Sequence, residues 1–225
     1  MPTVDWAANV QERGFSVVPG VLAADECRQI SAQFDREERF RSTVHMERFR
    51  FGKGTYRYFG YPLPEPIGAM RAEFYRRLVP VANAWAESLK TDGYPMEHAE
   101  FIDQCRRLGQ EKPTPLLLRY GAGDYNCLHQ DLYGPRVFPL QVVCMLSEPG
   151  RDFEGGELVL TEQRPRAQTR AHVVPLRQGD AAIIASHHFP RAGLRGVYRA
   201  TLRHGVGEIR RGQRFTLGIV FHDAA

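Results

Sequence analysis

The chain has 225 residues, 43% of them hydrophobic, which is enough to bury one substantial core. Its formal net charge is only +4, and 27 arginines with 3 lysines make up the 30 basic residues. So small a net charge does not demand a polyanionic partner, although arginine suits recognition of carboxylate and phosphate. No apolar run approaches the roughly 20 residues of a membrane span. We therefore expect one domain, residues 1–225, with no membrane association.

The start of the chain lacks the basic and then apolar pattern of a secretory signal, which predicts a cytoplasmic location. The cysteines are scattered and form no C-x-x-C pair: Cys27, Cys105, Cys127 and Cys144. This spacing favours buried thiols in a reducing compartment over disulfides or a zinc site.

The first half of the chain, residues 1–112, has mainly helical patterns. A strand-like run at 15–18 precedes a turn, and Asp25 is expected to cap a helix. Residues 67–90 place apolar side chains on one stripe at helical spacing. A third helix is expected to carry Phe101, Ile102, Cys105 and Leu108. Such stripes are typical of helices that pack against a core.

Beyond Pro113 and Pro115 the pattern changes to short runs of strand composition, separated by Gly and Pro turns. The expected strands cover residues 116–120, 137–146, 157–161, 172–175, 181–185, 198–204 and 215–221. Strands of this number and length are typical of a double-sheet jelly roll. We predict an α+β fold, with a jelly roll (double-stranded β-helix) in residues 113–225 and supporting helices and a lid from residues 1–112.

His129 and Asp131 stand two residues apart near the start of this strand-rich half. In an extended segment that spacing puts both side chains on one side. In the strand expected at 198–204, two arginines occupy the face opposite to His204, so His204 should point to the interior. Two imidazoles and one carboxylate on one face of a metal are the ligand set of non-haem Fe(II) oxygenases. His129, Asp131 and His204 are therefore the predicted metal ligands and catalytic centre.

Ten residues after His204 come Arg214 and, two further on, Thr216, in the last expected strand. Apolar residues occupy one face of that strand, while Arg214, Thr216 and Gly218 share the other. An arginine beside a hydroxyl can hold a carboxylate through charge-assisted hydrogen bonds. This face is predicted to bind the far carboxylate of a dicarboxylate co-substrate.

Other histidines compete for the metal. His187 and His188 precede Arg199 and Thr201 at a similar distance, but that arginine lies on the expected polar face. His222 has almost no chain after it to supply an anchor. The remaining histidines carry no partner pattern and are expected to be surface or capped residues: His45, His98 and His172.

From about residue 116 to 221 the chain resembles the bacterial prolyl-4-hydroxylase-like branch of the Fe(II)/2-oxoglutarate-dependent dioxygenases. The matching segments are residues 119–120, 129–131, 153–158, 179–180, 204–206 and 212–217. The chain is also similar to a bacterial group labelled as oxygenases acting on damaged DNA. The resemblance implies that His129, Asp131 and His204 bind Fe(II). It likewise implies that Arg214 and Thr216 bind 2-oxoglutarate, with Tyr120 as a further hydroxyl donor.

The implied reaction is hydroxylation of a C–H bond with O2 and 2-oxoglutarate, which releases succinate and CO2. A protein or peptide of prolyl type is our first interpretation of the substrate. Oxidative dealkylation of damaged nucleic acid by the same chemistry is the second. A metal-binding jelly roll without catalysis is the third.

Residues 48–61 interleave arginines and aromatic side chains with glycines. This segment could be a lid that stacks on a base and grips phosphate, or one that clamps a proline-containing peptide. It could also be a packed cover whose arginines face solvent. Nearby glutamates dilute the local basic field, which counts against strong phosphate binding.

Overall fold

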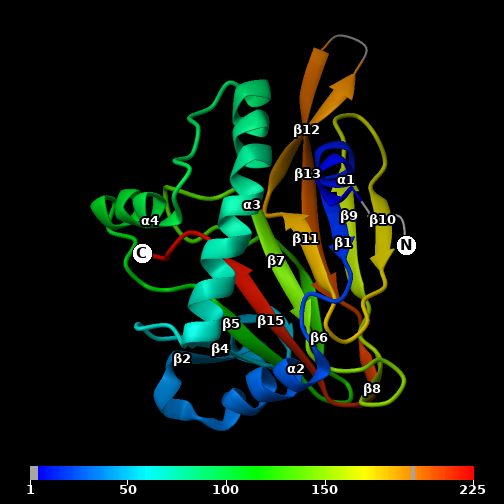
Figure 1. The fold of residues 1–225 in the computed structure, drawn as a ribbon. Coiled ribbons are helices and arrows are strands. Elements are labelled where there is room, and N and C mark those ends of the chain that lie inside the picture. Colours follow the sequence, from blue (N-terminus) through cyan, green and yellow to red (C-terminus); the bar gives the residue numbers. More distant parts are fainter. Residues whose placement is uncertain (1–4, 194–195) are drawn as a thin grey trace.

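Two antiparallel β-sheets form the body of the protein, and helices cover one of them (Figure 1). The structure is a computed structural model that describes residues 5–193 and 196–225. Its strands are β1 (Phe15–Val18), β2 (Phe40–His45), β3 (Gly52–Lys53), β4 (Thr55–Phe59), β5 (Leu116–Tyr120), β6 (Tyr125–His129), β7 (Leu140–Met145), β8 (Phe153–Gly155), β9 (Leu158–Gln163), β10 (Arg170–Val174), β11 (Ala181–Ala185), β12 (His188–Gly193), β13 (Gly196–Val206), β14 (Ile209–Gly212) and β15 (Arg214–Val220).

The larger sheet has the strand order β1-β11-β7-β15-β5-β4-β2, and the smaller has the order β10-β9-β13-β6-β3. Strand β12 pairs with β13, and β14 forms a separate ribbon with β8. Strands far apart in sequence therefore become neighbours, as in the predicted jelly roll. This topology brings β6, which ends at His129, next to β13, which carries His204.

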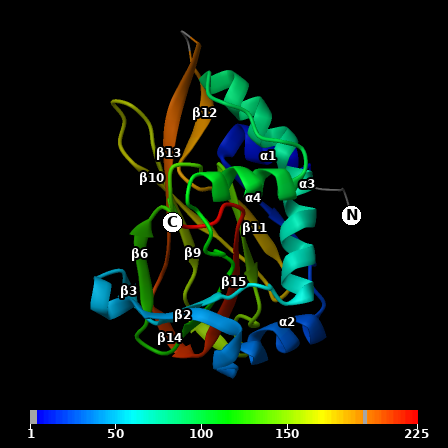
Figure 2. The ribbon, with the colours of Figure 1, turned by 90° about the vertical axis from the view of Figure 1, so that its left-hand side faces the viewer.

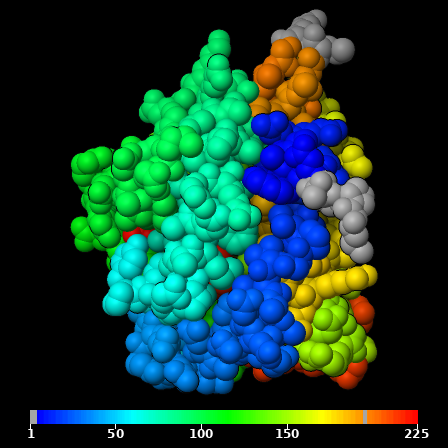
Figure 3. Space-filling model, viewed as in Figure 1, coloured from blue at the N-terminus to red at the C-terminus, as the bar shows by residue number. Residues whose placement is uncertain are grey.

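The helices are α1 (Trp6–Arg13), α2 (Ala24–Ser31), α3 (Glu65–Leu89) and α4 (His98–Arg107), and short 3-10 turns span Ala32–Asp35, Glu37–Arg39 and Met46–Phe49. The long helix α3 buries Ile67, Leu78 and Trp85 in the core. In the space-filling view, α3, α4 and the N-terminal segment form a continuous cover (Figure 3).

A buried ion pair fixes α3 to the end of the chain. Arg71 donates to Asp223 at 2.8 Å and to the Val220 carbonyl at 2.9 Å, and both charged side chains are buried. Removing one partner of such a pair leaves an uncompensated buried charge, which is strongly destabilising. The pair lies just beyond β15 and so helps to fix the end of the strand that carries Arg214.

The structure contains all seven strands expected beyond residue 115, but it differs from the sequence-based expectations elsewhere. Residues 1–112 are less helical than expected, because β2, β4 and β1 extend the larger sheet and β3 extends the smaller. Helix α2 begins at Ala24, and Glu26 accepts the Ala23 amide hydrogen bond at 2.7 Å in place of a cap by Asp25. Cys127 is exposed, whereas the other cysteines are buried.

No helix within residues 5–193 or 196–225 has the length and hydropathy that a membrane span requires.

Candidate metal and co-substrate site

Strand pairing brings the two candidate histidines together. His204 of β13 lies directly opposite His129 of β6, and their ring centroids are 4.2 Å apart. Asp131 follows β6 immediately, with one carboxylate oxygen 3.3 Å from the His204 Nε2 and the other 3.6 Å from the His129 Nε2. One ligand atom from each of these three residues lies within 4.8 Å of the others. Two imidazoles and a carboxylate thus converge on one point, where they could hold a metal ion.

His129 presents its Nε2 to that point. Its Nδ1 lies 2.8 Å from the Cys127 carbonyl oxygen, which can only accept, so Nδ1 carries the proton and Nε2 keeps its lone pair. Burial, followed by repulsion from His204, lowers the pKa of His129 from its ordinary value. The neutral imidazole that metal binding requires is therefore favoured.

Asp131 is nearly fully buried, and its carboxylate is held in the charged form. Burial alone would raise its pKa, but the hydrogen bond and charge of His204, the charge of His129 and the hydrogen bond from Tyr133 lower the pKa far below its usual range. A charged carboxylate facing two imidazoles is the arrangement that a divalent cation stabilises.

A β-bulge in β6 gives the site its shape. His129 pairs with His204 and Asn126 pairs with Val206, so the two residues between them on β6 oppose Gly205 alone on β13. Residues three apart on a regular strand point to opposite faces, whereas the bulge lets both Asn126 and His129 line the cavity. Gly205 is needed here because a Cβ atom at that position would lie 2.7 Å from the Asn126 carbonyl oxygen.

We expect Gly205→Ala to displace β6 and to weaken metal binding. The added methyl group meets backbone that cannot move without breaking the pairing, so a destabilisation of roughly 1–3 kcal/mol is expected. Gly207→Ala is the matched control, since its nearest neighbour at 3.3 Å is the flexible end of the Glu157 side chain. Denaturant unfolding and Mn(II) titration of both variants measure the effect. Equal behaviour of the two variants would contradict this role of the bulge.

The candidate anchor arginine is fully buried, and no carboxylate of the described residues pairs with it. Arg214 begins β15, and none of its guanidinium nitrogens has a hydrogen-bond partner in the described parts of the chain. Burial lowers its pKa to about 10, so the side chain remains charged at neutral pH. A buried cation without a partner is costly unless a ligand supplies the opposite charge. The unpaired guanidinium therefore fits an incoming carboxylate.

Arg214 and the three candidate ligands line one cavity of about 190 Å³. Thr216 and Gly218, which follow Arg214 on the same face of β15, line it as well, together with Tyr120. The Tyr120 hydroxyl accepts a hydrogen bond of 3.3 Å from the Asn126 side chain, and burial raises its pKa to about 12, so it stays protonated. The cavity thus offers a cation, hydroxyls and a metal-binding group within one small volume.

The competing histidines lie outside this cavity. His187 and His188 stack on each other, with ring centroids 3.4 Å apart, and His188 contacts Thr201 at 3.1 Å. The residues after His187 form strand β12. His222 is fully buried, and its Nδ1 accepts a 3.3 Å hydrogen bond from the Phe138 amide. The three other histidines are not cavity residues either: His45, His98 and His172.

Sequence reasoning missed three residues that shape the cavity. Asn126, which belongs to β6, and Tyr133 carried no ligand pattern, and Phe51 was included only as part of the segment 48–61. A glycine directly after His204 in an otherwise regular strand is a signal for a bulge, and it could have corrected the first of these. Nothing in the sequence alone marks Tyr133.

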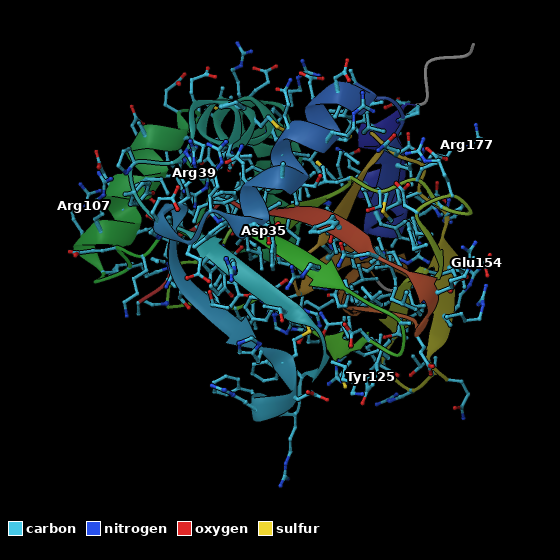
Figure 4. All side chains as sticks on the ribbon, turned by 90° about the horizontal axis from the view of Figure 1, so that it is seen from below. Asp35, Arg39, Arg107, Tyr125, Glu154 and Arg177 are labelled. Atoms are coloured by element: carbon cyan, nitrogen blue, oxygen red, sulfur yellow. The ribbon has the colours of Figure 1, made fainter. Side chains whose placement is uncertain are left out.

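Exposed apolar side chains gather on one segment and beside the candidate metal ligands in sequence. Residues 46–53 form an arm whose strand β3 pairs with β6. On this arm the rings of Phe49 and Phe51 stack on each other, with centroids 5.6 Å apart. Figure 2 shows β3 beside one end of β6, and Tyr125, labelled in Figure 4, lies on the outside next to the arm. We use "the rim" for five exposed side chains that lie on the arm, opposite it on β6, or next to His129 and Asp131 in sequence, of which Phe51 lines the cavity: Phe49, Phe51, Tyr125, Leu128 and Leu132.

Only part of the segment 48–61 has the freedom of a lid. Arg57 donates to the Phe34 carbonyl at 2.7 Å and to Glu37 at 3.0 Å, so it holds the N-terminal segment in place. Tyr56 and Tyr58 belong to β4 and form part of the cavity wall. The most exposed portion of this segment belongs to the arm.

Comparison with known proteins identifies the family of this chain. A family profile described as "Oxygenase, catalysing oxidative methylation of damaged DNA" matches residues 54–224. The chain belongs to this family, Oxygenase-NA. An uncharacterized protein of Mycobacterium tuberculosis, Rv2227, is 42% identical to this Oxygenase-NA chain over 168 residues, covering 74% of the chain and 72% of the relative.

Solved structures of similar fold are oxygenases as well. A Pseudomonas putida prolyl-4-hydroxylase has a TM-score of 0.57 at 16% identity, covering 98% of this chain and 97% of its own. A 2OG-Fe(II) oxygenase family oxidoreductase from Burkholderia pseudomallei has a TM-score of 0.56 at 18% identity, covering 100% and 94%. A Trichoplax adhaerens prolyl hydroxylase, in complex with a hypoxia inducible factor peptide fragment, has a TM-score of 0.58 at 15% identity, covering 96% and 86%.

At these identities the likeness shows the fold alone, which is the predicted jelly roll. Family, fold and the His-Asp-His group together make this Oxygenase-NA protein an oxygenase of jelly-roll fold with a group that could hold a metal ion. The interpretation as a metal-binding module without catalysis is thereby set aside.

Proposed function

We propose that His129, Asp131 and His204 hold Fe(II), and that Arg214 and Thr216 hold the far carboxylate of 2-oxoglutarate with help from Tyr120. The single observation that carries this assignment is the buried guanidinium of Arg214, which has no hydrogen-bond partner among the described residues and shares a cavity with the His-Asp-His group. A dicarboxylate in that cavity would neutralise the guanidinium at one end and reach the metal with the other.

The position of each residue in the fold determines its role in the proposed reaction. When bound, the iron would supply the oxidative decarboxylation of 2-oxoglutarate to succinate and CO2 and the oxidation of the substrate C–H bond. Arg214, at the start of β15, orients the co-substrate by a charge that is already buried and fixed. His129 and Asp131 stand at the end of β6, next to the rim, so a substrate bound there lies close to the metal.

For the substrate, we propose an extended protein or peptide of prolyl type. Five of the ten large hydrophobic side chains exposed in the described residues belong to the rim. Strand β3 pairs with β6 only at Tyr125 and Asn126, and one more hydrogen bond reaches the Cys127 amide. Beyond Cys127 no described strand covers this outer edge of β6. An apolar surface beside an open strand edge suits a peptide that adds main-chain hydrogen bonds.

A second candidate, oxidative dealkylation of damaged nucleic acid, is favoured by the family description and by the arm. Phe49 and Phe51 present stacked rings to solvent, flanked by the exposed Arg48 and Arg50. Base stacking with adjacent cations is how proteins hold single strands. Against this candidate, Lys53 of the arm is paired with Glu47 at 3.7 Å, which reduces the free positive charge.

Offering prolyl peptides and methylated single-stranded oligonucleotides to the Fe(II)-loaded enzyme separates the two candidates. For a peptide substrate we expect the mass of one added oxygen atom, little dependence on salt, and a KM raised roughly tenfold by Phe51→Ala, because a buried aromatic contact is worth about 1–3 kcal/mol. Arg48→Ala and Arg50→Ala should then change little.

Nucleic acid as the substrate predicts the opposite result. The oligonucleotide would lose one methyl group, and its affinity would fall steeply with salt as phosphate contacts release counterions. Removing Arg50 should then reduce the salt slope, and the peptides should remain unmodified. That outcome would overturn the peptide proposal while leaving the iron and 2-oxoglutarate assignments intact.

A further inference from the structure

The two oxygens of the Asp131 carboxylate have different surroundings. Oδ1 accepts a hydrogen bond from the Tyr133 hydroxyl and lies 3.6 Å from the His129 Nε2, whereas Oδ2 faces the His204 Nε2 at 3.3 Å. The first oxygen therefore shares its lone pairs with a hydroxyl donor. The second accepts from no hydroxyl or amide among the described residues, so it is the oxygen whose lone pairs remain available to a metal ion.

Tyr133 is held firmly enough to keep this contact. Its ring packs edge-on against Tyr58, with centroids 6.1 Å apart and an interplanar angle of 87°, and lies 5.9 Å from the ring of His222. Tyr58 is buried in turn, with the Arg41 guanidinium 4.6 Å from its ring centroid. A side chain supported on several sides has few alternative rotamers, so its hydroxyl stays directed at one carboxylate oxygen.

We infer that Tyr133 is a positioning residue that restricts Asp131 to binding the metal through Oδ2 alone. The inference rests on the proposed metal site and adds a requirement to it. A six-coordinate ion bound by two imidazoles and one carboxylate oxygen keeps three positions open, which 2-oxoglutarate and O2 need together. A carboxylate that bound through both oxygens would take one of those positions. The hydroxyl of Tyr133 thus favours co-substrate binding without touching the co-substrate.

The test is Tyr133→Phe, which keeps the ring and removes only the hydroxyl. Metal affinity or turnover should fall about 10–100-fold, the range found when a partner of a metal ligand is removed. Calorimetry on the Mn(II)-loaded protein should show weakened 2-oxoglutarate binding. The visible absorption of the Co(II)-loaded variant should also change, because the ligand geometry around the ion changes. Tyr198→Phe is the matched control: Tyr198 lies on the same strand as His204 but does not line the cavity.

Each outcome decides the matter. Unchanged 2-oxoglutarate affinity and an unchanged Co(II) spectrum in Tyr133→Phe would overturn the inference. Failure of metal-free Tyr133→Phe to fold would also overturn the inference, because the hydroxyl would then be needed for folding and not for positioning Asp131. If the unaltered protein bound neither Mn(II) nor 2-oxoglutarate, the proposed function itself would fail, which is a separate result.

Discussion

Alanine in place of His129, Asp131 or His204 is expected to abolish 2-oxoglutarate turnover and to weaken metal binding by more than about 100-fold, the upper end of the effect of losing a partner of a ligand. These side chains supply the only group of three His, Cys, Asp or Glu ligand atoms within 4.8 Å in the described residues. With one removed, two ligands remain, and the cavity offers no nearby replacement. Succinate release and Mn(II) titration measure the two effects.

The controls for this prediction are His187→Ala and His188→Ala. Both variants remove a histidine from the same half of the chain. The two histidines lie outside the cavity, and their rings stack on each other. Metal binding and turnover should therefore persist in both. Loss of the metal in His188→Ala, with retention in His204→Ala, would show that the assignment has the wrong histidine.

The part of the site on β13 and β15 could be predicted because regular strands alternate. Arg199 and Arg203 are exposed while Ala200, Leu202 and His204 are buried, as the alternation requires. Burial of one face fixes the register, since a slip by one residue would turn every side chain to the wrong face. Alternation also placed Arg214 and Thr216 on one face, and both line the cavity.

The strands of the first half could not be predicted in the same way. Strand β4 contains two tyrosines and an arginine between glycines, a composition that equally suits a mobile loop. Its pairing with β5 and β2 comes from partners distant in sequence. The bulge in β6 breaks the alternation on which such predictions depend, and so alternation could not place Asn126 in the cavity. Propensity is a weak guide where tertiary pairing decides.

Arg214→Ala is expected to leave metal binding intact and to raise the 2-oxoglutarate concentration needed for turnover at least about tenfold. A hydrogen bond to a charged group contributes roughly 1.5–3 kcal/mol, and about 1.4 kcal/mol corresponds to a factor of ten. Arg214 is fully buried, so water cannot replace the lost contact readily. Arg211→Ala is the matched control, because Arg211 lies three residues away with an exposed side chain paired to Glu154 at 2.8 Å.

Thermal unfolding gives an independent measure of the same contact. Without 2-oxoglutarate, Arg214→Ala should lower the melting temperature only by the effect of the lost packing contacts. No further loss is expected, because the guanidinium of the unaltered protein is buried with no described hydrogen-bond partner. Saturating 2-oxoglutarate should raise the melting temperature of the unaltered protein and of Arg211→Ala, since a ligand that binds only the folded state stabilises it. That increase should be nearly lost in Arg214→Ala. If 2-oxoglutarate stabilised the variant as much as the unaltered protein, the carboxylate would have to bind elsewhere, and the buried cation would need another partner.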